Sequence, residues 1–141
     1  MLKPLLIASA VLSFSFLALL AQNQAPANPP AGGEYKIPPE ASAEPNPVKP
    51  TPESLAAGKK MYNLDCAMCH GEKGDGKGDM AGDMKTKMPD FTDPESLKGR
   101  TDGDLFYIIK NGKGEMPPEG DRGKPTTLWN LVNYTRSFAK K

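Results

Sequence analysis

Apolar residues are unevenly distributed along this chain of 141 residues, and their pattern divides the chain into three parts. Sixteen of them fall in residues 1–21, eight in residues 22–52, and 29 in residues 53–141. The first part is a nearly continuous apolar run, the second is polar and rich in proline, and the third shows apolar residues at helical spacing. We therefore expect one small folded domain over residues 53–141, preceded by two segments of different character.

The first helix of the domain is predicted to begin at Thr51 or Pro52. Threonine is a good N-cap, and proline suits the first helical position because its missing N–H has no partner there anyway. Three residues then share one face at a helical spacing: Leu55, Gly58 and Tyr62. The helix leads directly to the two cysteines of the chain.

Two further helices are predicted in the second half of the domain. One begins after Thr101, carries apolar residues over 105–109, and ends at Asn111 and Gly112. The other follows Pro125, with an apolar stripe at Leu128, Leu131, Val132, Thr135 and Phe138. No useful run of alternating apolar and polar residues occurs. We expect an all-α fold with three main helices and long loops.

The loop between the first two helices is rich in glycine and aspartate, and we interpret it as a solvated connection. Its acidic residues could suggest calcium ligands: Asp75, Asp79 and Asp83. Their spacing does not match the calcium-binding loop of an EF-hand, which alternates acidic positions and ends in glutamate. The solvated loop is therefore the better interpretation.

The N-terminal part, residues 1–21, contains Lys3 and then an uncharged apolar run over residues 5–21. A short positive start followed by such a run is typical of a secretory signal peptide, with cleavage after Ala21. The run of 17 residues also reaches the lower limit for crossing a bilayer. An uncleaved membrane anchor is the alternative. Both place the domain outside the cytoplasm, in the periplasm or another extracytoplasmic space.

The middle part, residues 22–52, contains nine prolines among polar and small residues. Such a segment buries too little apolar surface to offset its ordering entropy. Proline favours an extended, semi-rigid polyproline conformation. We expect a disordered linker that separates the N-terminal segment from the domain.

Charge excludes one class of partner. The chain has 18 basic and 17 acidic residues, a net charge of +1, and the two signs are interleaved. A nucleic-acid-binding domain usually shows a basic stripe, so we expect no nucleic-acid partner. The domain is also only about one-third apolar, so its side chains alone make a thin core.

The strongest chemical signal is Cys66-Ala-Met-Cys69-His70, which contains both cysteines and the single histidine of the chain. A redox pair of the thioredoxin type needs a βαβ context that this sequence lacks. A four-ligand zinc site lacks a fourth cysteine or histidine. Cys-x-x-Cys-His is the attachment signal for c-type haem, in which two thiols one helical turn apart bond the porphyrin and the next histidine binds the iron.

An open second position on the iron would suit gas binding or peroxide chemistry, whereas a closed one suits electron transfer. Methionine is the natural candidate for the second ligand, because no second histidine exists. Met116 follows a glycine-containing turn and precedes two prolines, which together hold the backbone in a fixed place. Met88, before Pro89, is the rival. Met80 and Met84 are expected to be exposed loop residues. Two others lie too close to the cysteines to reach the opposite face: Met61 and Met68.

The segment from Thr51 to the C-terminus resembles the class I (mitochondrial-like) monohaem c-type cytochromes of bacterial type. The matching stretches are CAMCHG, FTDPESL, TDGDLFYIIKNGKGEMPP and LWNLVNYTRSF. The resemblance implies one covalently bound haem c enclosed by three helices, with His70 and Met116 as axial ligands. It also implies contact between the first and last helices, with Gly58 and Tyr62 meeting Leu131 and Tyr134. A carbonyl near Pro89 would orient His70.

The function implied is one-electron transfer between a donor and an acceptor redox protein in a respiratory or dehydrogenase chain, without enzymatic activity. One alternative is a cytochrome subunit of a larger membrane redox complex, tethered through residues 5–21. A haem peroxidase or gas-binding protein is a weaker alternative, because the sequence offers no distal histidine.

Overall fold

The computed structural model describes residues 35–140, so the expected signal or anchor segment and residues 22–34 of the expected linker lie outside the described part. The described residues form five α-helices, three short 3₁₀ helices and no β-strand, which confirms the all-α prediction. The α-helices are α1 (Pro39–Ser42), α2 (Pro52–Asp65), α3 (Ala67–His70), α4 (Asp102–Asn111) and α5 (Pro125–Ser137). The 3₁₀ helices are η1 (Ala81–Asp83), η2 (Pro94–Leu97) and η3 (Phe138–Lys140). None of the helices within residues 35–140 is long and apolar enough to cross a membrane.

The three main helices begin and end where their local signals predict. The side chain of Thr51 caps α2 by accepting the N–H of Ser54 at 3.3 Å. Thr101 and Asp104 form a reciprocal capping box at the start of α4, and Gly112 follows its last residue with φ of 76°. Pro125 occupies the first turn of α5.

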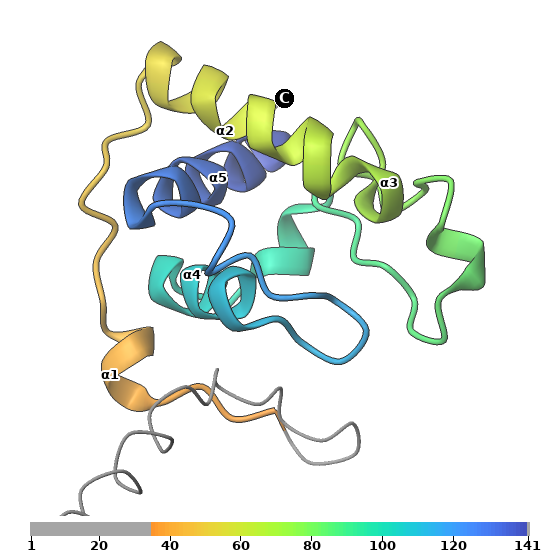
Figure 1. Ribbon diagram of the computed structural model, residues 1–141, viewed down its shortest axis with the longest axis horizontal. Helices are drawn as coiled ribbons and strands as arrows, with labels where there is room; N and C mark the ends of the chain where they lie inside the picture. Colours follow the sequence, from red (N-terminus) through yellow and green to blue (C-terminus); the bar gives the residue numbers. More distant parts are fainter. Residues whose placement is uncertain (1–34, 141) are drawn as a thin grey trace, which may run out of the picture.

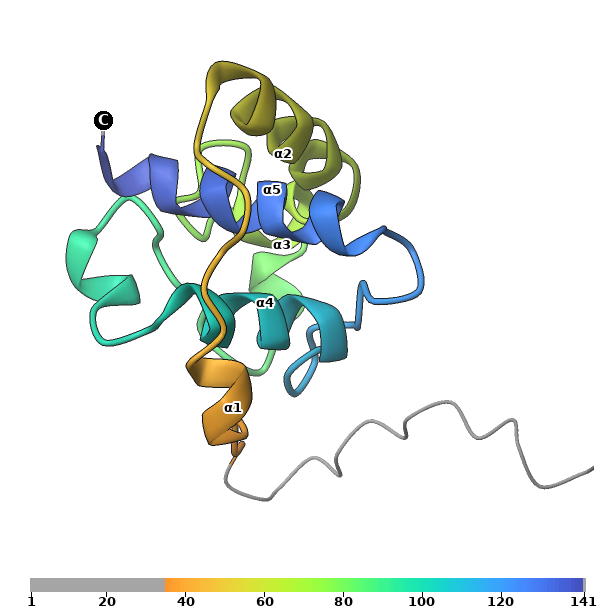
Figure 2. The same cartoon turned by 90° about the vertical axis from the view of Figure 1, so that its left-hand side faces the viewer.

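The first and last main helices cross in close contact, as Figures 1 and 2 show from two directions. Gly58 makes this approach possible: a Cβ atom there would lie 2.7 Å from Cβ of Tyr134 and closer still to the carbonyl oxygen of Asn130. One turn further along α2, the ring of Tyr62 meets the ring of Tyr134 edge-on at 5.4 Å. The predicted contact between these helices is therefore confirmed.

The core lies where α2, α4 and α5 meet. Its most deeply buried side chains are Tyr62, Leu128, Leu131 and Val132. Trp129 of α5 stacks on Phe106 of α4, with ring centroids 4.1 Å apart. This contact joins α4 to the crossed pair of α2 and α5. α5 supplies most of the fully buried residues because it is packed between the other two.

Residues 35–51 differ from the disordered linker expected there. This segment, which we call the N-terminal strap, contains α1 and runs along one side of the domain from α4 to the start of α2 (Figure 1). Tyr35 donates a hydrogen bond from its hydroxyl to the carbonyl of Gly112 at 2.8 Å. Ser42 in α1 bonds the carboxylate of Asp104, and Thr101 donates to the Ser42 carbonyl at 2.7 Å. These contacts offset the entropic cost of ordering a proline-rich segment.

Asn133 in α5 fixes the other end of the strap. Its amide donates to the carbonyl of Val48 and to the hydroxyl of Ser54, both at 2.9 Å, and its oxygen accepts from Asn46 at 2.9 Å. Asn133 is 6% exposed, so these bonds are shielded from water. A single buried amide thus joins the strap, the start of α2 and the middle of α5.

Candidate functional site

The two cysteines and the histidine occupy one tight helical turn. Cys66 ends α2, with its N–H bonded to the carbonyl of Tyr62 at 2.8 Å, and it also begins α3. The carbonyl of Cys66 accepts the N–H of Cys69 at 3.1 Å and that of His70 at 2.9 Å. Local hydrogen bonding therefore fixes the spacing of the three side chains.

The glycine-rich loop after α3 exposes most of its charged side chains, while its backbone closes the end of this turn. Its N–H groups satisfy carbonyls that the helix leaves without partners: Gly76 donates to His70 at 2.9 Å and Met80 to Met68 at 2.9 Å. Gly78 passes so near the helix that a Cβ there would lie 2.6 Å from the carbonyl oxygen of Ala67. Glycine is needed at this position because the loop backbone touches the helix backbone.

A single cavity of about 440 Å³ brings together all four residues expected to bind the cofactor: Cys66, Cys69, His70 and Met116. A volume of this size is typical of a small-molecule or cofactor site. Its walls are largely apolar and come from every main helix, including Tyr62, Leu105, Ile109 and Leu131. Met84 and Met88 also line it. The cavity therefore has a place for a flat apolar group between α3 and the loop that follows α4.

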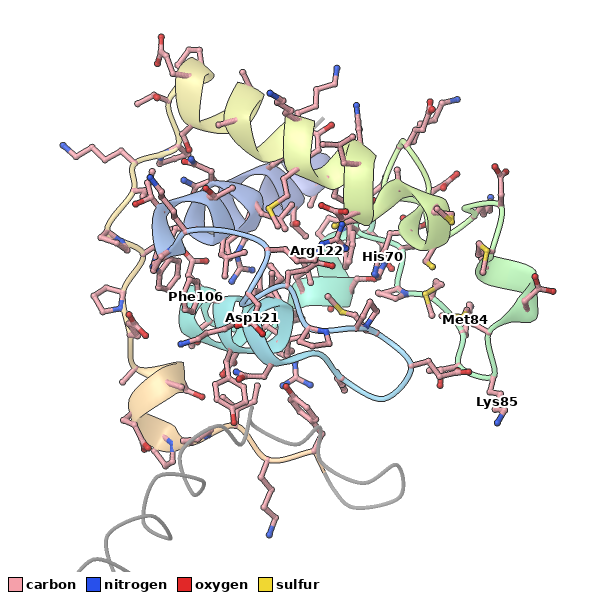
Figure 3. The ribbon with its side chains drawn as sticks, in the orientation of Figure 1. His70, Met84, Lys85, Phe106, Asp121 and Arg122 are labelled. Carbon is pink, nitrogen blue, oxygen red and sulfur yellow. The ribbon has the colours of Figure 1, made fainter. Side chains whose placement is uncertain are left out.

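His70 is half-buried and stacks on the ring of Phe91, with ring centroids 4.9 Å apart and 24° between the planes. Burial lowers the pKa of His70, which favours the neutral imidazole that a metal binds. Its Nδ1 atom is buried and has no hydrogen-bond partner among residues 35–140. The expected bond to a carbonyl near Pro89 is therefore not formed in this structure, where the Pro89 carbonyl faces Gly76 instead. Figure 3 shows His70 directed toward the interior of the molecule.

The surroundings of Cys66 argue against a dithiol redox pair. Both thiols are free in the structure. Burial, with smaller contributions from Glu119 and Asp65, raises the pKa of the Cys66 thiol to about 12. Reactive thiols of the thioredoxin type instead have lowered pKa values. Cys66 thus lies in the apolar surroundings suited to holding a cofactor.

Met116 lies in a tight hairpin that follows α4. Lys113 and Met116 exchange two backbone hydrogen bonds, each of 3.0 Å. Gly112 and Gly114 allow the turn because both have positive φ, 76° and 61°. The Tyr35 hydroxyl bonds Gly112 from outside the hairpin, and the side chain of Met116 packs against the hydrophobic core.

The other methionines are placed differently. Met80 is 41% exposed, as expected for a loop residue, and Met68 is 57% exposed. Met84 was expected to be exposed as well, but it is half-buried and lines the cavity. The cause is a loop contact: the N–H of Lys85 bonds a carboxylate oxygen of Glu115 at 2.9 Å, which draws this loop toward the hairpin. Lys85 itself projects outward (Figure 3).

Glu119 and Phe91 are parts of the site that the sequence did not reveal. Glu119 is 3% exposed and lines the cavity, although glutamate is rarely buried. Arg122 reaches back to Glu119 at 3.5 Å and makes a closer ion pair with Asp65 at the end of α2. The only signal for Glu119 in the sequence is its place three residues after Met116, and that place does not indicate burial.

Solved structures share this fold. The KustC0563 c-type cytochrome has a TM-score of 0.51 and 27% identity, covering 57% of this chain and 95% of that one. A chain of the Kuenenia stuttgartiensis reducing HAO-like protein complex Kustc0457/Kustc0458 has a TM-score of 0.60 and 29% identity, covering 65% of this chain and 46% of that one. The fold is that of a class I monohaem c-type cytochrome, a protein with one covalently attached haem c.

Residues 53–134 match the protein family described as cytochrome c oxidase, cbb3-type, subunit III, and the chain belongs to this family. The FixP subunit of the cbb3-type oxidase of Bradyrhizobium sp. (strain ORS 278) is 32% identical over 84 residues, which are 59% of this chain and 27% of that subunit. Chloroplastic cytochrome c6 of Chlamydomonas reinhardtii is 30% identical over 86 residues, 57% of this chain and 51% of that protein. The chain thus spans about a quarter to a half of these curated relatives.

The residues present fit a haem. The cavity is apolar where a porphyrin needs it to be, and both thiols and the imidazole reach it from one helical turn. The cavity also accounts for the thin core, because a large apolar group occupies the space that side chains do not fill.

Proposed function

We propose that this protein is a one-electron carrier located outside the cytoplasm, with no catalytic activity of its own. The observation that carries the proposal is the convergence of Cys66, Cys69, His70 and Met116 on one apolar cavity. The thiols of Cys66 and Cys69 would attach the haem as thioethers. His70 and Met116 would be the two axial ligands. When bound, the haem supplies an iron that exchanges one electron between its ferrous and ferric states.

The protein's contribution is to hold these ligands still and to exclude water. Phe91 stacks on the His70 ring and limits its rotation. The paired bonds between Lys113 and Met116 fix the backbone that carries the thioether. With both ligands held, a change of charge at the cofactor requires little movement of the protein. Methionine ligation raises the reduction potential relative to ligation by two histidines.

Met116 is preferred to Met88 and Met84 as the second ligand. All three line the cavity, but of these only Met116 packs against the hydrophobic core and lies in a hydrogen-bonded hairpin. The other two lie in the segment after η1, whose tie to the hairpin is the bond from Lys85 to Glu115. A ligand that must keep its place through many redox cycles belongs on the better fixed loop.

The partners are expected to be a donor and an acceptor redox protein. Pro117 and Pro118 are exposed beside Met116, and they supply an apolar contact surface next to the cofactor. The net charge of +1 does not support strong steering toward one highly charged partner. Encounters between such carriers are small and transient.

Two variants and a matched control test the ligand assignment. Replacing both Cys66 and Cys69 by Ala should remove the haem mass from the denatured chain. Met116→Ala should abolish the methionine–iron charge-transfer absorption and lower the reduction potential, whereas Met88→Ala should preserve both. Survival of the absorption in Met116→Ala, with its loss in Met88→Ala, would reverse the assignment. Rapid carbon monoxide binding by the ferrous wild type at neutral pH would instead favour the gas-binding or peroxidase alternative.

A second candidate function is a cytochrome subunit of a larger membrane redox complex. The family match favours it, because the family is described as a subunit of a cbb3-type oxidase. The apolar segment over residues 5–21 would then be the tether. Retention in membranes after washing with high salt would support the tethered subunit. Recovery of a mature chain from the periplasmic fraction would support the free carrier.

A further inference from the structure

Glu119 is a buried acid with no role in holding the cofactor. Its side chain is 3% exposed and lines the same cavity as His70 and Met116. Its Oε2 atom is buried and has no hydrogen-bond partner among the residues that the structure describes. The backbone is fixed, because the N–H of Glu119 bonds the carbonyl of Ile109 at 2.9 Å. The backbone bond fixes the position of the residue, and the low exposure of its side chain places the carboxyl group in the cavity wall.

The charge on Glu119 is only partly compensated. Arg122 lies 3.5 Å from Oε1 of Glu119, but its closer ion pair is with Asp65, so within residues 35–140 one cation is shared by two carboxylates. Arg122 is also 59% exposed, so water screens it. Cys66, which interacts with Glu119 from the end of α2, adds no charge, because in the holoprotein its sulfur would be a thioether. Other charged groups on the cavity walls are Lys87, Arg100, Lys113 and Glu115.

These surroundings favour the protonated acid. Burial raises the pKa of Glu119, the Arg122 guanidinium lowers it, and the Asp65 carboxylate raises it again, leaving it above the ordinary value for glutamate. A carboxyl group whose pKa is raised keeps its proton to a higher pH than a solvated glutamate does. The geometry supports the same conclusion independently, since an ionised carboxylate would have one buried oxygen without a donor.

We propose that Glu119 is a redox-linked proton site, so that the protein carries a proton together with its electron. This inference rests on the proposed function. On reduction, one electron passes from the donor protein to the iron, and one proton passes from water to Oε2 of Glu119, forming an O–H bond. On oxidation, the electron leaves to the acceptor and the proton returns to water. The summed charge of the iron and the carboxyl group is unchanged by the cycle.

The physical reason is the attraction between the oxidised cofactor and the Glu119 carboxylate in a medium of low dielectric constant. The oxidised cofactor has one more positive charge than the reduced one, and a carboxylate in the cavity wall stabilises that charge. Reduction removes the charge, so the proton affinity of Glu119 rises. By linkage, ionised Glu119 must lower the reduction potential by the amount that oxidation lowers its pKa. Surface carboxylates couple less strongly because water screens them.

The test is the reduction potential of the holoprotein measured across pH, with two glutamate-to-glutamine variants. The wild-type potential should fall as pH rises through the window between the two Glu119 pKa values, approaching about 59 mV per pH unit for one proton per electron. Glu119→Gln should remove this slope and give a higher potential above the window. The control Glu72→Gln removes the same charge from an exposed position and should keep the wild-type slope. A flat wild-type profile, or an unchanged slope in Glu119→Gln, would overturn the proposal.

A second measurement covers the case in which Glu119→Gln fails to fold or to bind haem. Infrared difference spectra of the wild type, reduced minus oxidised, should show a protonated carboxyl band that shifts when glutamate is labelled with carbon-13. Absence of that band, or insensitivity to the label, would contradict the proposal. A protein with no covalent haem would instead disprove the proposed function, and its denatured mass reports this before any titration.

Discussion

At the scale of single residues, Gly58 sets the distance between two helices. Its missing side chain lets α2 approach the backbone of Asn130 and the Cβ of Tyr134. The contact matters for the site because α2 continues directly into Cys66, so the crossing determines where the cysteines lie relative to the cavity. One hydrogen atom in place of a methyl group therefore positions one wall of the cofactor site.

Gly58→Ala is expected to destabilise the protein. The added methyl group gains about 1 kcal/mol of helix propensity, but it forces apart a packed contact at a cost of roughly 1–3 kcal/mol. A net loss of stability should appear in chemical unfolding of the holoprotein. Gly82→Ala is the matched control, since nothing lies within 4 Å of a Cβ built there, and its stability should be unchanged. Equal stability of the Gly58 variant and the wild type would show that the crossing relaxes freely.

The residues that could be predicted from the sequence are those whose chemistry is local. Cys66, Cys69 and His70 lie within five consecutive residues, and their spacing alone indicates haem attachment. Phe91 and Glu119 could not be found this way, because each acquires its role from a contact with a distant part of the chain. Glutamate side chains are usually exposed, and nothing in the sequence around Glu119 indicates that this one is buried.

At the scale of elements, helix boundaries and the strap show opposite behaviour. Thr51, Thr101 and Gly112 are end signals that act within one turn, so the helices they bound were predictable. The strap has no such local signal. Its order comes from partners far along the chain, such as Asn133 and Asp104, and proline content alone favoured a disordered linker.

The contact with the strap also affects the ionisation of Asp104. Burial raises the pKa of its carboxyl group, but the hydrogen bonds from Ser42 and Thr101 outweigh burial, and the pKa is lowered.

Asn133→Ala is expected to loosen the strap. The variant leaves the Val48 carbonyl and the Ser54 hydroxyl without their buried donor, and losing such bonds costs roughly 1–3 kcal/mol. Hydrogen exchange should accelerate in residues 46–50, and the unfolding free energy should fall. Asn63→Ala, at an exposed position in α2, is the control and should change neither. Unchanged exchange in the strap of Asn133→Ala would mean that the other contacts hold it alone.

At the scale of the whole molecule, the free-energy cost of leaving the cofactor cavity empty is comparable with the free energy of unfolding of a small protein. An empty cavity costs about 24 cal/mol per Å³, so 440 Å³ corresponds to at most about 10 kcal/mol. Small proteins are stable by only about 5–15 kcal/mol. A group that fills the cavity would remove this cost.

The chain without haem is therefore expected to lose its fixed tertiary packing. A variant with Ala at both Cys66 and Cys69, prepared free of haem, should keep part of its far-ultraviolet circular dichroism and lose its near-ultraviolet signal. Its thermal unfolding should be broad, whereas that of the holoprotein should be cooperative. A sharp transition of the haem-free variant at the holoprotein temperature would show that the helices pack adequately without the cofactor.

The strap also determines how the molecule responds to a mechanical load. Its anchoring contacts lie in series along the segment: first Tyr35 with Gly112, then Ser42 with Asp104, then Asn46 with Asn133. A pull on the chain at residue 35 would therefore peel them off one at a time, because each bond bears the force alone. The first contact to break would be the bond from Tyr35 to Gly112, which holds the hairpin of Met116. Tension at the N-terminal end of the domain would reach the hairpin of Met116 before it disturbs any of the three main helices.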